Sequence, residues 1–246
     1  MTAEHLYLDL MKRCLTDLIY ERSGIGLDGS EFSEAKRSEG GDWPVRAHTM
    51  IGLKRLDNIQ ACYEAVRGDG VAGDLIETGV WRGGATIFMR ALLAAYADVD
   101  RHVWVADSFQ GLPKPNAEQY PADEGDRHHT VEVLAVGRDE VERNFAAYGL
   151  LDDRVHFVEG WFRDTLPAIP AERFSVVRLD GDMYESTMQA LDALYPRLSP
   201  GGFLIVDDFG AVPGCAKAVT DFRMRHGIAE PIEQIDWAGV YWRRSR

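Results

Sequence analysis

Short apolar runs that end abruptly in acidic residues dominate the hydrophobic pattern of this chain. Two of them, Phe174–Leu179 and 203–206, are too short for ordinary helices and rich in β-branched residues, which predicts buried strands. Between them, residues 186–198 show helical spacing, and the Pro-Gly-Gly sequence at 200–202 is expected to close this helix. Because a strand, a helix and a strand in this order form a unit with parallel strands, both strands should end at the same edge of one sheet.

Four acidic residues gather at that edge. Asp180 and Asp182 follow the first strand, and Asp207 and Asp208 follow the second. Carboxylates placed so close together repel one another unless a cation lies between them, and hard divalent cations prefer oxygen ligands. A single acidic residue after a strand more often caps a helix than binds a ligand. Two pairs on neighbouring strands indicate an active site that holds a metal.

Three further predicted strands end in acidic residues. They are a short strand that ends in Glu77, residues 102–106 followed by Asp107, and residues 154–158 followed by Glu159. Ligands of a doubly wound parallel sheet bind at the carboxyl ends of its strands. The pattern therefore predicts an α/β fold whose site lies at this one edge.

The first of these strands leads into a glycine-rich turn at 79–84 and a helix over 85–96. Glycines let a ligand approach the start of the helix, although a tight turn without a ligand is an equal alternative. The spacing matches neither the dinucleotide fingerprint nor the phosphate loop. Asp107 suits the two hydroxyls of a ribose, and Trp161 either stacks on a purine or belongs to the core. Together these residues predict a nucleoside site beside the cation.

Two amphipathic helices precede the sheet. The apolar stripe of residues 5–20 must be buried on the body of the domain, on a lid or on a second subunit. Residues 23–44 are polar and glycine-rich, which predicts a mobile loop or a short helix around 31–37. The second amphipathic helix ends at Gly68.

Residues 110–139 form a long polar stretch with several prolines, and a loop of this length at the ligand edge usually covers a substrate. We expect it to be poorly ordered without ligands. It contains His128 and His129, and adjacent histidines are more often solvated than bound to a substrate. The expected domain division is an N-terminal helical and lid-like extension over residues 1–70 and a sheet domain over 71–246, closed by a helix at 215–226 and a hairpin of strands 231–236 and 240–243.

Composition narrows the function classes. The net charge of −13 argues against extended contact with nucleic acid or anionic lipid. Cys14, Cys62 and Cys215 are widely spaced, which predicts neither a disulfide framework nor a zinc site. The apolar runs fall short of a membrane span, and the first residues lack the pattern of a signal peptide, so we expect a cytoplasmic protein.

Five motifs at these positions resemble those of a known family. They are Ala47-His48-Thr49-Met50-Ile51-Gly52, Glu77-Thr78-Gly79-Val80-Trp81-Arg82-Gly83-Gly84, Val105-Ala106-Asp107-Ser108-Phe109-Gln110-Gly111, Asp180-Gly181-Asp182-Met183-Tyr184 and Val206-Asp207-Asp208-Phe209. Over nearly its whole length the chain resembles the metal-dependent sugar O-methyltransferases of antibiotic pathways, the macrocin, mycinamicin and noviose (TylF-like) enzymes.

The resemblance implies a class I methyltransferase fold, Rossmann-like, with a seven-stranded, mostly parallel sheet and an antiparallel C-terminal hairpin. It implies S-adenosylmethionine as cofactor and a glycoside of a natural product as substrate. We also expect a homodimer, with the apolar stripe of residues 5–20 as a candidate for its contact. The residues implied to bind the cofactor are Thr49, Met50, Glu77, Gly79, Gly83, Asp107, Ser108, Gly160, Trp161 and Asp180. Magnesium, or a similar divalent cation, would be held by Asp180, Asp207 and Asp208, and Asp182 would take the proton of the sugar hydroxyl.

Three other functions stay open at this point. A catechol-type O-methyltransferase for small phenols would use the same metal chemistry, but the polar stretch 110–139 favours a polar acceptor. A nicotinamide-dependent oxidoreductase would be expected to carry the missing glycine fingerprint. A cofactor-binding protein without catalysis would lack a base beside the metal, whereas Asp182 stands there.

Overall fold

The computed structural model describes residues 2–20 and 24–245. Within these residues the main sheet has seven strands in the order β5-β4-β3-β6-β7-β9-β8. Strands β3 to β7 pair in parallel, and β9 runs antiparallel to both β7 and β8. The strands are β3 (Asp74–Thr78), β4 (Val103–Asp107), β5 (Val155–Glu159), β6 (Phe174–Leu179), β7 (Leu198–Val206), β8 (Glu233–Gln234) and β9 (Val240–Arg243). The predicted fold class is confirmed.

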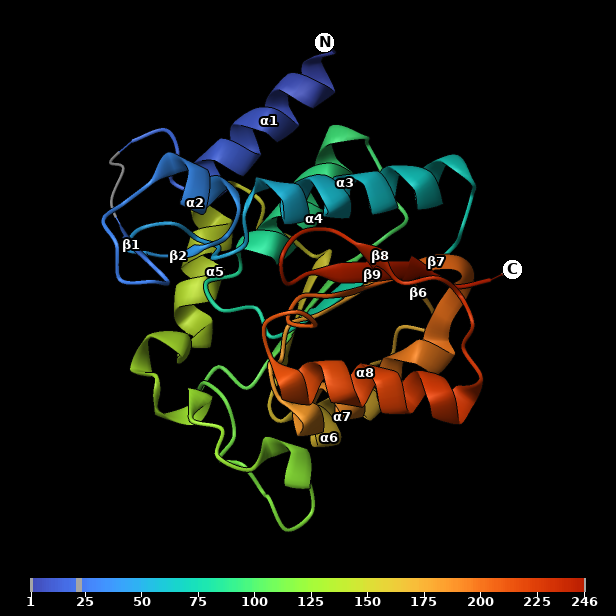
Figure 1. The fold of residues 1–246 in the computed structure, drawn as a ribbon. Helices are drawn as coiled ribbons and strands as arrows, with labels where there is room; N and C mark the ends of the chain where they lie inside the picture. The colour runs from blue at the N-terminus through green and yellow to red at the C-terminus, as the bar shows by residue number, and fades with distance from the viewer. Residues whose placement is uncertain (1, 21–23, 246) are drawn as a thin grey trace.

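Helices cover both faces of this sheet, which explains why the central strand β6 is buried along its whole length (Figure 1). Helices α1, α3, α4 and α5 pack on one face, and α6, α7 and α8 pack on the other. The helices are α1 (Ala3–Leu15), α2 (Glu34–Ser38), α3 (Leu53–Gly68), α4 (Gly84–Ala95), α5 (Arg138–Ala147), α6 (Phe162–Thr165), α7 (Tyr184–Leu194) and α8 (Pro213–His226).

Several predicted boundaries are wrong. The helix expected over 186–198 begins at Tyr184 and ends at Leu194, and a 3₁₀ turn at Tyr195–Arg197 follows it. The Pro-Gly-Gly sequence at 200–202 lies inside β7, so it does not close the helix. Proline is tolerated there because the parallel ladder of β6 and β7 is irregular before Val176.

Helix α1 buries part of its apolar stripe on the body of the domain, one of the three expected possibilities, and leaves Leu10 exposed. Leu8, Met11 and Leu15 are buried in the same core as α4. The helix ends at Leu15, whereas the sequence pattern predicted an end near residue 20. Within the described residues, no helix is both long and apolar enough to span a membrane.

The expected mobile loop over 23–44 is instead a small antiparallel sheet of β1 (Gly24–Gly26) and β2 (Asp42–Pro44), with α2 between its strands. Helix α2 confirms the short helix predicted in this region, and residue 23 lies outside the described residues. Two strands of three residues each are too short to show a periodic pattern. A buried ion pair between Arg37 and Asp42, 2.8 Å apart, holds this unit together.

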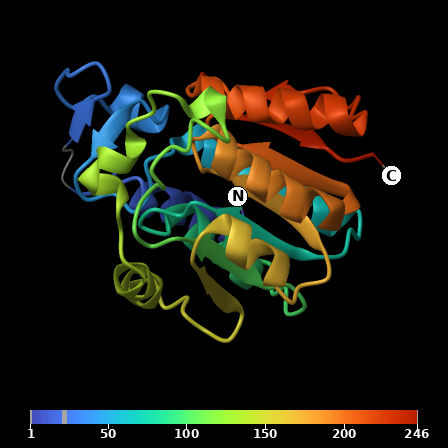
Figure 2. The same cartoon turned by 90° about the horizontal axis from the view of Figure 1, so that it is seen from below.

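Residues 110–137, called the lid below, run between β4 and α5 at the edge where the parallel strands end. The lid contains three 3₁₀ turns, at Pro121–Asp123, His128–Thr130 and Glu132–Leu134. Seen from below, the lid and the N-terminal unit of β1, α2 and β2 lie toward the same side of the molecule (Figure 2). The division of the chain at residue 70 stays a prediction.

Candidate active site

The turn after β3 is built on a close approach between two backbones. Gly79 has a φ of +83°, and a Cβ atom there would lie 1.7 Å from the carbonyl oxygen of Asp180. Gly84 opens α4, and its N–H donates to the carbonyl of His48 at 2.9 Å. The glycine-rich turn therefore brings the end of β3 against the end of β6 and seats residues 48–50 beside the start of α4.

Asp107 closes β4 and organises the neighbouring loops. Its Oδ2 accepts the N–H of Val80 at 2.7 Å, and its Oδ1 accepts the N–H of Phe109 at 2.7 Å. Burial raises the pKa of Asp107, and these backbone hydrogen bonds act against that rise. A carboxylate oxygen can accept more than one hydrogen bond, so both oxygens stay available to hydroxyl donors of a ligand.

Two adjoining cavities open at this edge. The first is lined by residues from the turns after β3, β4, β5 and β6 and by the lid, including Met50, Gly79, Asp107, Ser108, Gly160, Trp161 and Phe162. The second is lined by Thr49, Glu77, Asp207 and Asp208, by Asp126 and His128 of the lid, and by Leu27, Trp43 and Trp237. Met50, Trp81, Leu134, Asp180 and Asp182 line both cavities. The two spaces therefore meet at the acidic residues that follow β6.

Three carboxylates converge on one point of the second cavity. One oxygen from each of Asp180, Asp207 and Asp208 lies within 4.8 Å of the others. Burial raises the pKa of Asp180 and Asp208, and repulsion between the acidic neighbours raises it further. Three oxygen donors that destabilise one another in this way fit a hard divalent cation.

Two buried arginines form ion pairs with the carboxylates of this cluster and its neighbours. Arg178, next to the last residue of β6, donates to Glu77, to Asp180 at 2.7 Å and to Asp207. Arg55 of α3 donates to the other oxygen of Asp207 at 2.5 Å and to Asp236 at 2.7 Å. Both oxygens of Asp207 therefore face guanidinium groups, and the second lone pair of each oxygen is left for a metal.

Glu77 lines the second cavity and shares Arg178 with Asp180, which lines both cavities. Burial raises the pKa of Glu77 to about 7, although the Arg178 guanidinium acts in the opposite direction. Within the described residues, its Oε2 is buried and has no hydrogen-bond partner. That oxygen is a natural acceptor for a donor group of a ligand.

Asp182 stands where the two cavities meet. It has a φ of +57°, a backbone conformation that is unusual for a residue with a side chain, and its N–H donates to Asp208 at 3.1 Å. Trp81 and Phe109, in the turns after β3 and β4, also have positive φ values. Strained residues that cluster at one sheet edge are typical of functional sites.

The environment of Asp182 tunes its basicity. Burial raises its pKa to about 6, with a contribution from the nearby Asp207 and Asp126, while His128 acts in the opposite direction. A carboxyl group with this pKa is ionised near neutral pH and is a stronger base than an ordinary aspartate. Asp182 is therefore suited to accept a proton.

His128 faces this site from the lid. Its Nδ1 lies 2.7 Å from Asp126 Oδ2. Although burial acts against it, the carboxylates of Asp182 and Asp126 raise the pKa of His128. His129 is exposed, as the pattern of adjacent histidines predicted, and His128 is partly exposed and lines the second cavity.

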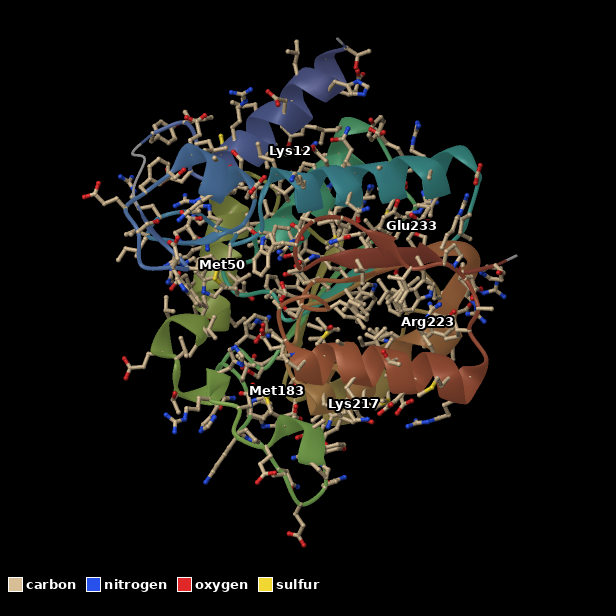
Figure 3. All side chains as sticks on the ribbon, in the orientation of Figure 1. Lys12, Met50, Met183, Lys217, Arg223 and Glu233 are labelled. Carbon is tan, nitrogen blue, oxygen red and sulfur yellow. The ribbon has the colours of Figure 1, made fainter. Side chains whose placement is uncertain are left out.

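Most of the predicted site residues lie in these cavities. Met50, Gly79, Asp107, Ser108, Gly160, Trp161, Asp180 and Asp182 line the first, as expected for a cofactor site. Thr49 and Glu77, which were expected beside the cofactor, line the second. Gly83 lines neither cavity. A Cβ atom there would lie 2.7 Å from Val141, and the positive φ of Gly83 lets the chain turn into α4. The predicted binding roles of these residues stay predictions. In Figure 3, Met50 and Met183 lie on the side of this edge, and Arg223 and Glu233 lie toward the other end.

Three residues of the site, Arg55, Arg178 and Asp236, were not predicted from the sequence pattern. Arg178 carried a signal that could have revealed it, because a charged side chain inside the apolar run Phe174–Leu179 must meet a buried partner. Arg55 and Asp236 carried no such signal. Their pairing joins residues 181 positions apart in the sequence.

Comparison with solved structures agrees with this architecture. The structure of the O-methyltransferase NovP superposes on this chain with a TM-score of 0.94 at 50% identity, covering 99% of this chain and 100% of that one. The fold, with its parallel strands, its reversed last hairpin and its ligand edge, is that of a class I methyltransferase.

Sequence comparison identifies the family. A sequence model of the family described as Macrocin-O-methyltransferase (TylF) matches residues 10–244, and the chain belongs to this family of O-methyltransferases. One relative, 56% identical over 99% of this chain and 94% of its own length, is the 8-demethyl-8-(2,3-dimethoxy-alpha-L-rhamnosyl)-tetracenomycin-C 4'-O-methyltransferase of Streptomyces olivaceus. Another, 52% identical over 99% of this chain and 98% of its own length, is the Mycinamicin III 3''-O-methyltransferase of Micromonospora griseorubida. This membership confirms the resemblance and excludes a nicotinamide-dependent oxidoreductase.

Proposed function

We propose that this enzyme methylates a sugar hydroxyl of a glycosylated natural product, with S-adenosylmethionine as methyl donor and magnesium as the metal. The observation that carries the proposal is the meeting of the two cavities at Asp180 and Asp182. A donor in the first cavity and an acceptor in the second would face each other there. The names of the two relatives, which state such acceptors or products, support the choice of substrate class.

The first cavity suits the cofactor. Asp107 offers two carboxylate oxygens to the ribose hydroxyls, and the rings of Trp161 and Phe162 offer faces for the adenine. Glu77 lines the adjoining second cavity, and its buried Oε2, which has no hydrogen-bond partner among the described residues, would offer an acceptor to the methionine end where the two cavities meet. The cofactor, when bound, supplies an electrophilic methyl group on a sulfonium that is an excellent leaving group.

The second cavity suits the acceptor. Asp180, Asp207 and Asp208 would hold the magnesium, whose charge, when it is bound, lowers the pKa of a nearby hydroxyl. Asp182 accepts the proton of that hydroxyl as the oxygen takes the methyl group. Because the N–H of Asp182 is bonded to Asp208, the base and the metal ligands keep a fixed relation to each other.

The outer wall of the second cavity suits the part of the acceptor that carries the sugar. Leu27, Trp43 and Trp237 line it, and 38% to 48% of their surfaces are exposed. Apolar side chains that line a cavity and stay half exposed are typical of a surface that a ligand covers. We therefore place the sugar at the acidic residues and the apolar aglycone against this wall, called the aglycone wall below.

The test is methyl transfer itself. The purified protein would be incubated with S-adenosylmethionine and either the rhamnosylated tetracenomycin named for the relative or a simple catechol, with magnesium or with a chelator. We expect mass spectrometry to show the addition of one methyl group to the glycoside and none to the catechol, and the chelator to abolish it. Methylation of the catechol alone would favour the phenol alternative, and full activity with the chelator would remove the metal from the proposal.

A further inference from the structure

A carboxylate of the lid caps the helix that follows Asp182. Helix α7 begins at Tyr184, and its own N-cap residue, Met183, offers no side-chain hydrogen bond. Asp123, in the first 3₁₀ turn of the lid, accepts the N–H of Tyr184 on Oδ1 at 2.7 Å and the N–H of Glu185 on Oδ2 at 2.9 Å. The first N–H groups of a helix have no partner inside the helix. A residue 61 positions upstream of Tyr184 therefore satisfies them.

The surrounding residues are shaped around this contact. Asp123 is only 2% exposed. A Cβ atom on Gly214, at the start of α8, would lie 3.0 Å from Asp123 Oδ1 and 3.1 Å from the nitrogen of Tyr184. The rings of Tyr120 and Tyr184 lie side by side, with centroids 6.2 Å apart. The side chain of Asp123 is therefore buried between the first turns of α7 and α8.

This contact joins the lid, which lines both cavities, to helix α7, which lines the first. Lid residues line the first cavity through Leu112 and the second through His128, and Leu134 lines both. Helix α7 lines the first cavity from below, and its first turn directly follows Asp182. Loss of the contact would free the lid and loosen the turn that carries the base.

We propose that Asp123 is a positioning residue that latches the lid over both cavities and fixes the turn of Asp182. The free energy that one helix cap contributes corresponds to a change of about 2- to 30-fold in the ratio of closed to open lid. A latch of this strength favours the closed lid and still lets it open in each catalytic cycle. This inference goes beyond the proposed function, because it does not depend on the identity of the acceptor.

The test is hydrogen exchange on the whole protein, without ligand and with S-adenosylhomocysteine. In Asp123→Ala we expect exchange in the lid and in the first turn of α7 to rise about 2- to 30-fold, with β3 and β6 unchanged. The affinity for S-adenosylhomocysteine should fall by a smaller factor, because it follows the fraction of closed lid, which changes less than the ratio of closed to open lid. Asp123→Asn, which keeps one acceptor oxygen, should restore part of both effects.

Two further variants separate a latch from a plain structural cap. Glu124→Ala changes the exposed neighbour of Asp123 in the lid and should behave like the unmodified protein. Gly214→Ala crowds Asp123 from the side of α8 and should open the lid without removing the carboxylate. Faster exchange in α7 with an unchanged lid would reduce Asp123 to a helix cap and overturn the proposal, as would unchanged exchange in both segments. If S-adenosylhomocysteine fails to bind even the unmodified protein, the proposed cofactor is wrong, and the ligand-free exchange still decides on the latch.

Discussion

The four acidic residues after β6 and β7 differ in what their oxygens contact. Asp207 faces two guanidinium groups, Asp180 faces one, and Asp208 accepts the N–H of Asp182. Asp182 lies past the turn at Gly181, outside the three converging oxygens. Residues of one type at one sheet edge can therefore serve as metal ligands and as a base, because their neighbours differ.

Replacement of Asp182 by asparagine tests the assignment of the base. The amide keeps the size of the side chain but accepts no proton, so we expect turnover to fall by roughly 10²- to 10⁴-fold. Calorimetry should show unchanged affinity for magnesium and for S-adenosylmethionine.

The control for this variant is Asp208→Asn, which should weaken magnesium binding and recover part of its rate at high magnesium. Asp207→Asn is a poorer control, since it would disturb two buried arginines. If excess magnesium also rescues Asp182→Asn, Asp182 is a metal ligand and another group takes the proton.

Gly79 gives a second prediction at this scale. In Gly79→Ala the added methyl group meets the backbone of Asp180 in a conformation that already disfavours a side chain, so we expect a loss of roughly 2–6 kcal/mol in the free energy of unfolding. Denaturant unfolding would measure it. Gly149→Ala is the matched control, because its φ is also positive but nothing lies within 4 Å of its Cβ position, so it should lose only about 1–2 kcal/mol. Equal stability of both variants would mean that the turn has room to relax.

At the scale of elements, the N-terminal unit and the last hairpin build the aglycone wall together. The indole N–H of Trp237, in the turn before β9, donates to the carbonyl of Glu39 at 3.1 Å, next to α2. The guanidinium of Arg55 lies 5.4 Å from the centre of the same ring. Residues from opposite ends of the chain thus meet beside the acidic cluster, and the aglycone wall forms only where they meet.

Trp237→Ala tests the aglycone wall. Loss of a half-exposed indole should lower kcat/KM for an acceptor with a large apolar aglycone by about 10- to 100-fold. The same sugar as its methyl glycoside should be methylated by the variant and the unmodified enzyme at equal rates. Trp237→Phe keeps an aromatic face without the N–H donor and should retain most of the preference. An equal loss with both acceptors would show that Trp237 positions the sugar.

At the scale of the whole molecule, acidic charge concentrates on one edge of a chain whose net charge is −13. Arg55 and Arg178 face Glu77, Asp180, Asp207 and Asp236, and Asp182 and Asp208 lie beside them. These carboxylates outnumber the two arginines, so in the folded protein without metal they repel one another where the central strands end. A bound divalent cation would relieve that repulsion and so stabilise the fold.

The expected outcome is a rise in melting temperature with magnesium. At a concentration 100 times the dissociation constant, the gain is about 2.7 kcal/mol, which corresponds to a shift of roughly 5–10 °C for a chain of this size. Calorimetry with magnesium, and then with excess chelator, would measure it. Asp208→Asn should remove most of the shift. If the melting temperature of the unmodified protein does not change with magnesium, the proposed metal site is contradicted.

The sequence by itself determined the sheet and the edge where the site lies. Short runs dominated by apolar residues, such as Phe174–Leu179, are expected to be buried strands. The acidic residues after them mark where each strand leaves the core. Because parallel strands end at one edge, the order of the strands along the chain is enough to place Asp107, Asp180 and Asp207 together. The family resemblance added roles to these positions.

Only the tertiary structure decided what lies between and above those residues. The parallel pairing of Glu77 with Arg178 comes from the register of β3 on β6, which no local pattern records. The strands β1 and β2 are too short to show periodicity, and Asp123 reaches Tyr184 through a lid without regular spacing. These contacts join segments far apart in the chain. Their energies depend on distances that folding sets, so a pattern of neighbouring residues could not reveal them.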